Sequence, residues 1–131
     1  MSSGPYTQAQ VLLIKASEDE TALRATGIPD AVLEFHAQQA VEKLMKALIS
    51  AHSASFELTH NLMRLAAALQ DLGECLPPTP IALSELNDFA VDYRYDLLHQ
   101  QAAPTAGELI ATVHFIREHV LARIAALSQT P

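Results

Sequence analysis

Apolar residues recur every three to four positions along most of this 131-residue chain, and no segment alternates regularly between apolar and polar residues. That spacing is typical of amphipathic helices, whereas half-buried β-strands would need the alternation. Glycine is also scarce, with four in the whole chain. We therefore expect an all-α protein, an up-and-down bundle of about five helices in one domain, residues 1–131, with its core in about 7–127.

The second of these helices has the clearest pattern. It is expected to begin at Asp30, a good N-cap residue that follows Pro29. Its apolar positions form a continuous stripe made of Leu33, Ala37, Ala40, Val41, Leu44 and Leu48. Polar residues spaced four apart follow the opposite face, namely Glu34, Gln38, Glu42 and Lys46. The order of Glu42 and Lys46 along the helix favours an ion pair between them.

The first and last helices differ in how clearly they are marked. The first is expected from Thr7, whose spacing to Gln10 fits a capping box, to about 26–27. A polar run at 17–20 interrupts its apolar stripe, which consists of Leu12, Ala16 and Leu23. The last helix opens with a clear capping box at 105–108. Its buried edge is expected to consist of Leu109, Val113, Ile116, Val120, Ile124 and Leu127.

Two shorter helices are expected between these. The third is predicted to run from the cap residue Thr59 to Gly73, with an apolar stripe made of Leu62, Leu65, Ala66, Leu69 and Leu72. The fourth is predicted to have Thr79 as its N-cap and Pro80 as its first helical residue. Its apolar positions are Leu83, Leu86, Ala90 and Tyr93.

The charge balance limits which partners the chain can bind. Fifteen acidic residues against eight basic ones give a formal net charge of −7. Nonspecific binding of nucleic acid rests on many lysine and arginine contacts to phosphates, so a broad nucleic-acid surface is not expected. Any such role needs a small local site, or positive charge from a partner or a second subunit.

Other features of the sequence exclude several protein classes. The single cysteine, Cys75, rules out an internal disulfide and a cysteine metal cluster. The apolar run at 11–14 is far too short to span a membrane, and residues 1–5 lack the features of a signal peptide. His36 and His60 are not at metal-ligand spacing. We therefore expect a cytoplasmic protein with no metal, no cofactor and no membrane association.

Candidate chemistry gathers at the end of the fourth helix. Arg94 can hold a phosphate through paired hydrogen bonds, and His99 can move a proton near neutral pH. In metal-independent RNA cleavage, His99 would act as general base and acid while Arg94 stabilises the phosphate charge. Asp96 would either orient the imidazole or repel the substrate. Structural roles stay open too, because Arg94 can pair with Asp88 or Asp92, and His99 can be an ordinary loop residue.

Three further residues are candidates for binding RNA or a nucleotide. Tyr95 can stack on a base, although it can equally be a packing or dimer contact. Gln39 and Lys43 suit a nucleotide, because an amide can bind base edges and an ammonium pairs with phosphate. Together with Gln38 and Glu42, however, they are also typical of a solvated or subunit-contact face of a helix.

Three segments resemble the HEPN family (higher eukaryotes and prokaryotes nucleotide-binding domain). Residues 35–48 are similar to its long second helix, 59–62 to the start of its third helix, and 87–95 to the run into its Arg-Tyr-Pro-Asp signature. The likeness extends over about 12–125. In this chain the signature reads Arg94-Tyr95-Asp96-Leu97, so its proline is missing.

The resemblance implies a helical homodimer, often paired with a small nucleotidyltransferase as toxin and antitoxin. It also implies metal-independent ribonuclease activity in those members that carry an arginine and a histidine at a spacing that Arg94 and His99 satisfy. In such members the two Arg–His pairs meet in a cleft at the dimer two-fold. Because many relatives with this signature have no demonstrated activity, a non-catalytic module for nucleotide binding or protein interaction is the alternative.

Overall fold

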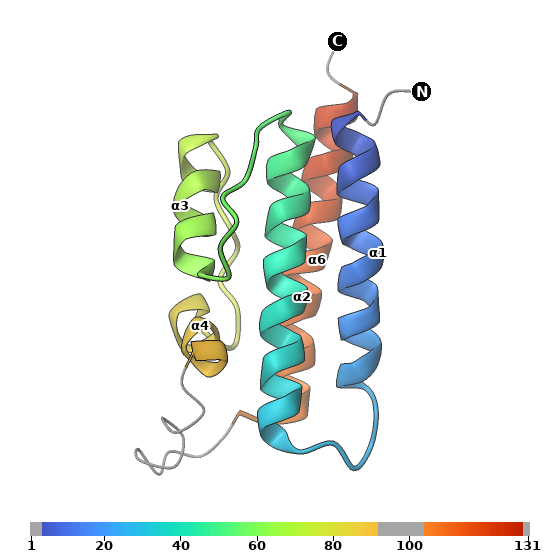
Figure 1. Ribbon diagram of the computed structural model, residues 1–131, viewed down its shortest axis with the longest axis vertical. Coiled ribbons are helices and arrows are strands. Elements are labelled where there is room, and N and C mark those ends of the chain that lie inside the picture. The colour runs from blue at the N-terminus through green and yellow to red at the C-terminus, as the bar shows by residue number, and fades with distance from the viewer. Residues whose placement is uncertain (1–3, 92–103, 130–131) are drawn as a thin grey trace.

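The computed structural model describes residues 4–91 and 104–129, and within these ranges it contains five helices and no strand (Figure 1). They are α1 (Pro5–Leu23), α2 (Asp30–Ala51), α3 (Leu62–Asp71), α4 (Leu83–Val91) and α6 (Ala106–Ser128). The predicted all-α fold class is confirmed. None of these described helices combines the length and the apolar content that a membrane span requires.

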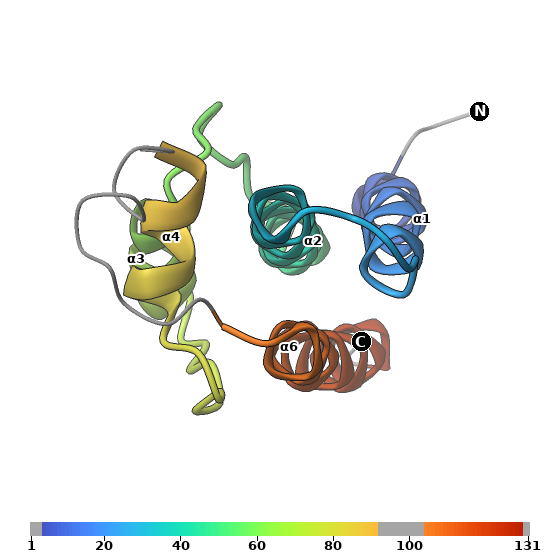
Figure 2. The ribbon, with the colours of Figure 1, turned by 90° about the horizontal axis from the view of Figure 1, so that it is seen from below.

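Helix α2 is the centre of the molecule. In Figure 2 it lies between α1 and α6 on one side and the pair α3 and α4 on the other, and it contacts all four. Helix α1 runs antiparallel to α2, whereas α6 runs in the same direction as α2 (Figure 1). The segment 52–61 returns along the bundle before α3 begins, so α3 also points the same way as α2.

The predicted apolar stripe of α2 forms the core. Five of its members have no exposed surface at all, and they are Ala37, Ala40, Val41, Leu44 and Leu48. Helix α1 buries Ala9, Ala16 and Leu23, seven residues apart, against this stripe. Alanine at two of these three positions allows the backbones of α1 and α2 to approach closely, since it has no side chain beyond Cβ.

The polar row on the opposite face of α2 is also buried, which corrects the expectation that such residues form a solvated or subunit-contact face. Glu34, Gln38, Glu42 and Lys46 each have less than a tenth of their surface exposed. The predicted ion pair is confirmed, with Lys46 Nζ 2.9 Å from Glu42 Oε2. These side chains are covered because segment 52–61 and α3 pack over them.

That buried row holds segment 52–61 in place. The Gln38 amide donates to the His60 carbonyl at 2.8 Å, and His60 Nδ1 lies 2.9 Å from Glu42 Oε1. The Lys46 ammonium lies 5.3 Å from the centre of the Phe56 ring, a cation–π distance. Each buried polar group in these contacts therefore has a partner, which offsets the free energy lost when it left water.

Helices α1 and α2 begin at residues other than those predicted. Helix α1 begins at Pro5 rather than Thr7, because proline lacks only an N–H group that the first helical turn leaves unpaired. Asp30 is the first residue of α2 rather than its cap, and Pro29 takes the N-cap position.

The N-cap of helix α3 lies two residues later than predicted. Its N-cap is Asn61, whose side-chain oxygen accepts from the N–H groups of Met63 and Arg64. Thr59, the predicted cap, instead accepts a hydrogen bond from the Asn61 N–H at 3.1 Å. Two capping residues separated by one position compete here, and Asn61 rather than Thr59 fixes the start at Leu62.

Helices α1 and α3 also end earlier than predicted. They end at Leu23 and Asp71, before the expected ends at 26–27 and Gly73. Gly27 and Gly73 have φ angles of +74° and +85°. The chain therefore turns through the left-handed region at these glycines, just beyond the last helical residues.

Helix α4 begins at Leu83, three residues after Pro80. The Thr79 hydroxyl donates to the Ile81 carbonyl at 2.6 Å instead of capping a helix. The Ile81 N–H in turn donates to the Thr112 hydroxyl of α6 at 3.1 Å. This cross-connection keeps residues 79–81 out of the helix and attaches the segment before α4 to α6.

The capping box at the start of the last helix is confirmed. The Glu108 N–H donates to the Thr105 hydroxyl at 3.1 Å, and the Thr105 N–H donates to the Glu108 carboxylate at 3.0 Å. Four residues of the predicted apolar edge are buried, namely Leu109, Val113, Ile116 and Val120.

A buried carboxylate joins three elements at the opposite end of the bundle from α4. Glu74 accepts hydrogen bonds from Arg123 of α6, at 2.8 and 3.1 Å, and lies 2.8 Å from Nε2 of His52. Burial of this carboxyl group opposes its ionisation, but the hydrogen bonds from Arg123 and His52 outweigh that effect and lower the pKa of Glu74.

We predict that Glu74→Gln lowers the free energy of unfolding by about 1–3 kcal/mol at neutral pH, because Arg123 and His52 lose a charged acceptor. Since the pKa of Glu74 is lower in the folded state than its ordinary value of 4.5, this contribution is complete above that pH and is lost below it. Urea unfolding at pH 7 and pH 3 measures the difference. The exposed Glu118 provides the control variant Glu118→Gln, and an equal loss at both pH values would contradict the prediction.

Candidate functional site

Helix α4 carries the chain toward the predicted catalytic residues. It ends at Val91, three residues before Arg94. In Figure 2, where α1, α2 and α6 are viewed along their axes, α4 crosses the view, so it lies transverse to the long helices. Of its predicted apolar positions, Leu86 is fully buried and packs in the core with residues of α2 and α3.

Asn87 fixes α4 against the start of α3. Its side-chain oxygen accepts a hydrogen bond from the N–H of Leu62 at 2.8 Å. This N–H belongs to the first turn of α3, where backbone donors have no partner within their own helix. Asn61 accepts from the next two N–H groups. Helix α3 is therefore capped both by the residue directly before it and by a residue of α4. Sequence spacing alone could not show this role of Asn87, because its partner lies 25 residues away.

Every predicted catalytic residue lies outside the described part of the chain. Arg94, Asp96 and His99 fall within residues 92–103, as does Tyr95, the candidate for stacking on a base. Asp92, one of the alternative partners of Arg94, falls there too. The catalytic roles and the structural alternatives for these residues therefore stay predictions.

The two other candidate binding residues, Gln39 and Lys43, both have intramolecular partners. The Gln39 amide donates to the Gln38 side-chain oxygen at 2.8 Å. Lys43 Nζ lies 2.5 Å from Asp19 Oδ2 of α1, and a quarter of its side chain stays exposed. A binding role for either residue remains a prediction, and for Lys43 it would use an ammonium that already neutralises a carboxylate.

Asp19 is a residue of this surface that the sequence pattern did not identify. Its two oxygens are shared between two side chains of α2, with His36 Nδ1 at 2.9 Å from Oδ1 and Lys43 on Oδ2. The side chain of Asp19 is only 9% exposed, so its ion pair with Lys43 and its contact with His36 link α1 to α2 through a buried carboxylate. The polar run at 17–20, which interrupts the apolar stripe of α1, was the only signal of it.

The same polar run also pairs with α6. Arg117 Nε lies 3.1 Å from Glu20 Oε2, and Arg117 donates to the Ser17 hydroxyl. Burial of Glu20 raises the pKa of its carboxyl group, and the nearby Arg117 and Arg24 offset only part of that effect. The polar run that interrupts the α1 stripe therefore links α1 to two helices, to α2 through Asp19 and to α6 through Glu20.

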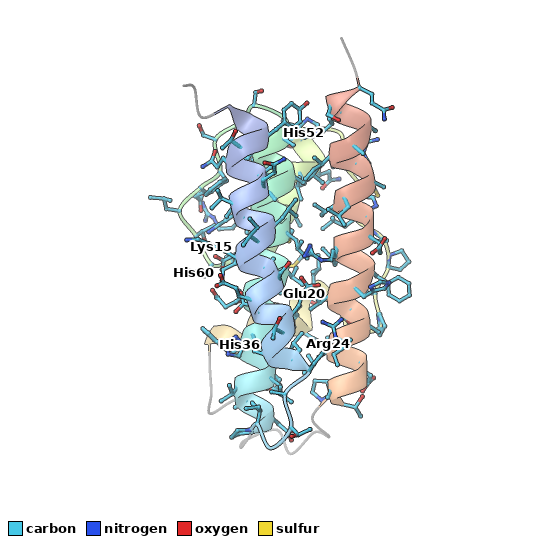
Figure 3. All side chains as sticks on the ribbon, turned by 90° about the vertical axis from the view of Figure 1, so that its right-hand side faces the viewer. Lys15, Glu20, Arg24, His36, His52 and His60 are labelled. Atoms are coloured by element: carbon cyan, nitrogen blue, oxygen red, sulfur yellow. The ribbon has the colours of Figure 1, made fainter. Side chains whose placement is uncertain are left out.

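The lysines and two of the histidines lie on one side of the molecule. Figure 3 shows Lys15, His36 and His60 on the side of the bundle away from α6. Lys43 and Lys46 join them, since these residues pair with Asp19 on α1 and with the carboxylate that His60 contacts. The chain has only three lysines, so all of them lie on this one side, in a protein that is acidic overall.

The described residues contain no group of three or more His, Cys, Asp or Glu side chains arranged to hold a metal ion. The sequence matches the HEPN domain family over residues 14–124. The chain belongs to the HEPN domain family. This match covers most of the sequence, including all of α2, α3 and α4, and it confirms the resemblance seen in residues 35–48, 59–62 and 87–95. No curated protein and no solved structure matches the chain significantly.

We predict that Asn87→Ala lowers the free energy of unfolding by about 1–2 kcal/mol, because the N–H of the buried Leu62 loses its acceptor. Asn87→Asp keeps an acceptor oxygen at the same position and is expected to retain most of the stability. Urea unfolding of both variants measures the difference. If the two variants are equally destabilised, the hydrogen bond to α3 is not what holds α4.

Proposed function

We propose that this HEPN protein is a cytoplasmic homodimer that works with a small nucleotidyltransferase, in the manner of a toxin–antitoxin pair. Within that role we propose metal-independent cleavage of RNA by Arg94 and His99. The observation that carries the proposal is the family match over residues 14–124, combined with an arginine and a histidine five positions apart after α4.

The chemistry follows from the two side chains. The imidazole of His99 would take the proton of the ribose 2′-hydroxyl and return a proton to the leaving 5′-oxygen. The guanidinium of Arg94 would hold the non-bridging phosphate oxygens, whose charge increases in the transition state. Asp96 would orient the imidazole.

A dimer suits this role because of the charge of the chain. With a net charge of −7, a single copy has little general attraction for RNA. Two copies would bring two arginines to one cleft and raise the local positive potential without changing the rest of the surface.

A second candidate function is nucleotide or partner binding without catalysis. It is supported by the gathering of lysines and histidines beside Gln39 on the α1–α2 side of the molecule. In that case Gln39, Lys43 and Tyr95 would be the contact residues, and Arg94 and His99 would have structural roles.

We predict that the wild-type protein cleaves RNA in the presence of a metal chelator, and that His99→Ala and Arg94→Ala each lower the rate by about a hundredfold or more. The measurement is cleavage of a labelled RNA by proteins purified in parallel.

The exposed His114 and Arg64 supply the matched controls His114→Ala and Arg64→Ala, which should cleave at the wild-type rate. Equal trace activity in all five proteins would indicate contamination and would leave the non-catalytic function standing.

Light scattering should give a particle mass twice that of the single chain, and a monomer at all concentrations would contradict the shared-cleft arrangement.

A further inference from the structure

A cavity opens where the start of α1 meets the end of α2. The two helices are antiparallel, so Gln8 of α1 and Ser50 of α2 lie at the same end of the bundle (Figure 1). The cavity has a volume of about 420 Å³, which lies in the range of small-molecule sites. The chain that follows α2 forms the rest of its border, and the full lining consists of Gln8, Ser50, Ser53, Ala54, Ser55, Phe56 and Leu58.

The lining combines uncharged polar groups with apolar surface. None of the described residues that form it has an ionisable side chain. The serine hydroxyls and the Gln8 amide can each donate and accept hydrogen bonds. Phe56 and Leu58 supply the apolar surface, and Leu58 is 94% exposed. A charged ligand would lose hydration here without meeting an opposite charge in the lining, so the cavity favours a neutral ligand.

Ser50 is the residue of the lining that points most directly to a ligand. It is 1% exposed, and its hydroxyl has no hydrogen-bond partner among the described residues. A hydroxyl that leaves water without a partner destabilises the fold, so such groups are rare unless a bound molecule satisfies them. Because Ser50 lines the cavity, a hydroxyl group of a bound ligand can supply the missing partner.

Ser53 holds a backbone conformation that its side chain disfavours. Its φ angle is +62°, in the left-handed region, and it is the one non-glycine residue with a positive φ in the described part of the chain. Glycine adopts this conformation without steric strain, as Gly27 and Gly73 do just beyond α1 and α3. Serine at the corresponding position after α2 instead keeps a hydroxyl in the cavity lining, and such backbone strain is typical of functional sites.

We propose that this cavity binds a neutral ring that carries several hydroxyl groups, such as a monosaccharide or a cyclitol. The serine hydroxyls and the Gln8 amide exchange hydrogen bonds with the hydroxyls on the rim of the ring, and a C–H face of the ring lies against Phe56. The ammonium of Lys46, 5.3 Å from the centre of the Phe56 ring, helps to fix that aromatic side chain. A wholly apolar ligand would leave the hydroxyls of the three lining serines without partners, whereas this ligand class matches both kinds of surface.

Heteronuclear NMR of the whole protein tests the proposal, with D-glucose, D-galactose, N-acetyl-D-glucosamine and myo-inositol as probes. At least one of these is expected to bind at millimolar concentration and to shift the amide signals of residues 50–58. D-glucuronate and cyclohexanol are the comparators, because the first adds a charge to the sugar ring and the second keeps a single hydroxyl. Both are expected to bind about tenfold more weakly than the best neutral probe.

Two serine variants separate binding from folding. Ser50→Ala removes a hydroxyl without a partner, and Ser53→Gly relieves the left-handed backbone, so neither is expected to lower the Tm. Each is expected to weaken binding of the best probe by about three- to tenfold, because one hydrogen bond to the ligand is lost. Ser84→Ala removes an exposed hydroxyl from α4 and is the control, which should bind as the wild type does.

The proposal is overturned if none of the neutral probes binds, or if glucuronate or cyclohexanol binds as tightly as the best of them. It is also overturned if Ser50→Ala and Ser53→Gly both bind that probe as the wild type does, because the ligand then lies elsewhere. A lower Tm of Ser50→Ala would show that its hydroxyl has a partner within the fold, and would equally overturn the site. The His99→Ala protein should bind the probe as the wild type does, so failure of this site and failure of the proposed nuclease are distinguishable.

Discussion

The buried carboxylate of Glu42 makes two contacts on which the packing around α2 depends. It accepts a hydrogen bond from Lys46 one turn along the same helix and lies within hydrogen-bond distance of His60 in the segment that returns over α2. Because α2 is enclosed by α1, α3, α4 and α6, it has little solvent face on which to leave polar residues. Its polar side chains must therefore find partners inside the protein, and those partners set the path of segment 52–61 and the place where α3 begins.

The helices and the apolar core follow from patterns that are local in sequence. The stripe from Leu33 to Leu48 follows from the period of a helix. The capping box at Thr105 follows from the unpaired N–H groups of the first helical turn. The predicted start of α4 was wrong because it depends on a contact distant in sequence, and that of α3 was wrong because Asn61, not Thr59, caps the helix. Ile81 is held by Thr112 and Leu62 by Asn87, and no spacing within a short window contains either pair.

The candidate site shows the same division between what the sequence predicts and what it does not. Residue types suggested Lys43 as a phosphate contact and gave the Arg94–His99 pair, but they could not show that Lys43 shares Asp19 with His36. Polar residues on a helix look solvated until the neighbouring elements are placed, and the row from Glu34 to Lys46 was misread for that reason. For Arg94 and His99, which follow α4, two residues alone are a weak pattern, and the proposed ribonuclease chemistry therefore depends mainly on family membership.

The restriction of lysine to one side of the molecule has a practical consequence for anyone who immobilises this protein. Among the side chains of this chain, reagents that couple through primary amines can react only with those lysines, so they would attach it through the α1–α2 side and mask that side. Cys75 is exposed and is the single thiol of the chain, in the connection between α3 and α4. A maleimide at this position would leave the lysine-bearing side free toward solution.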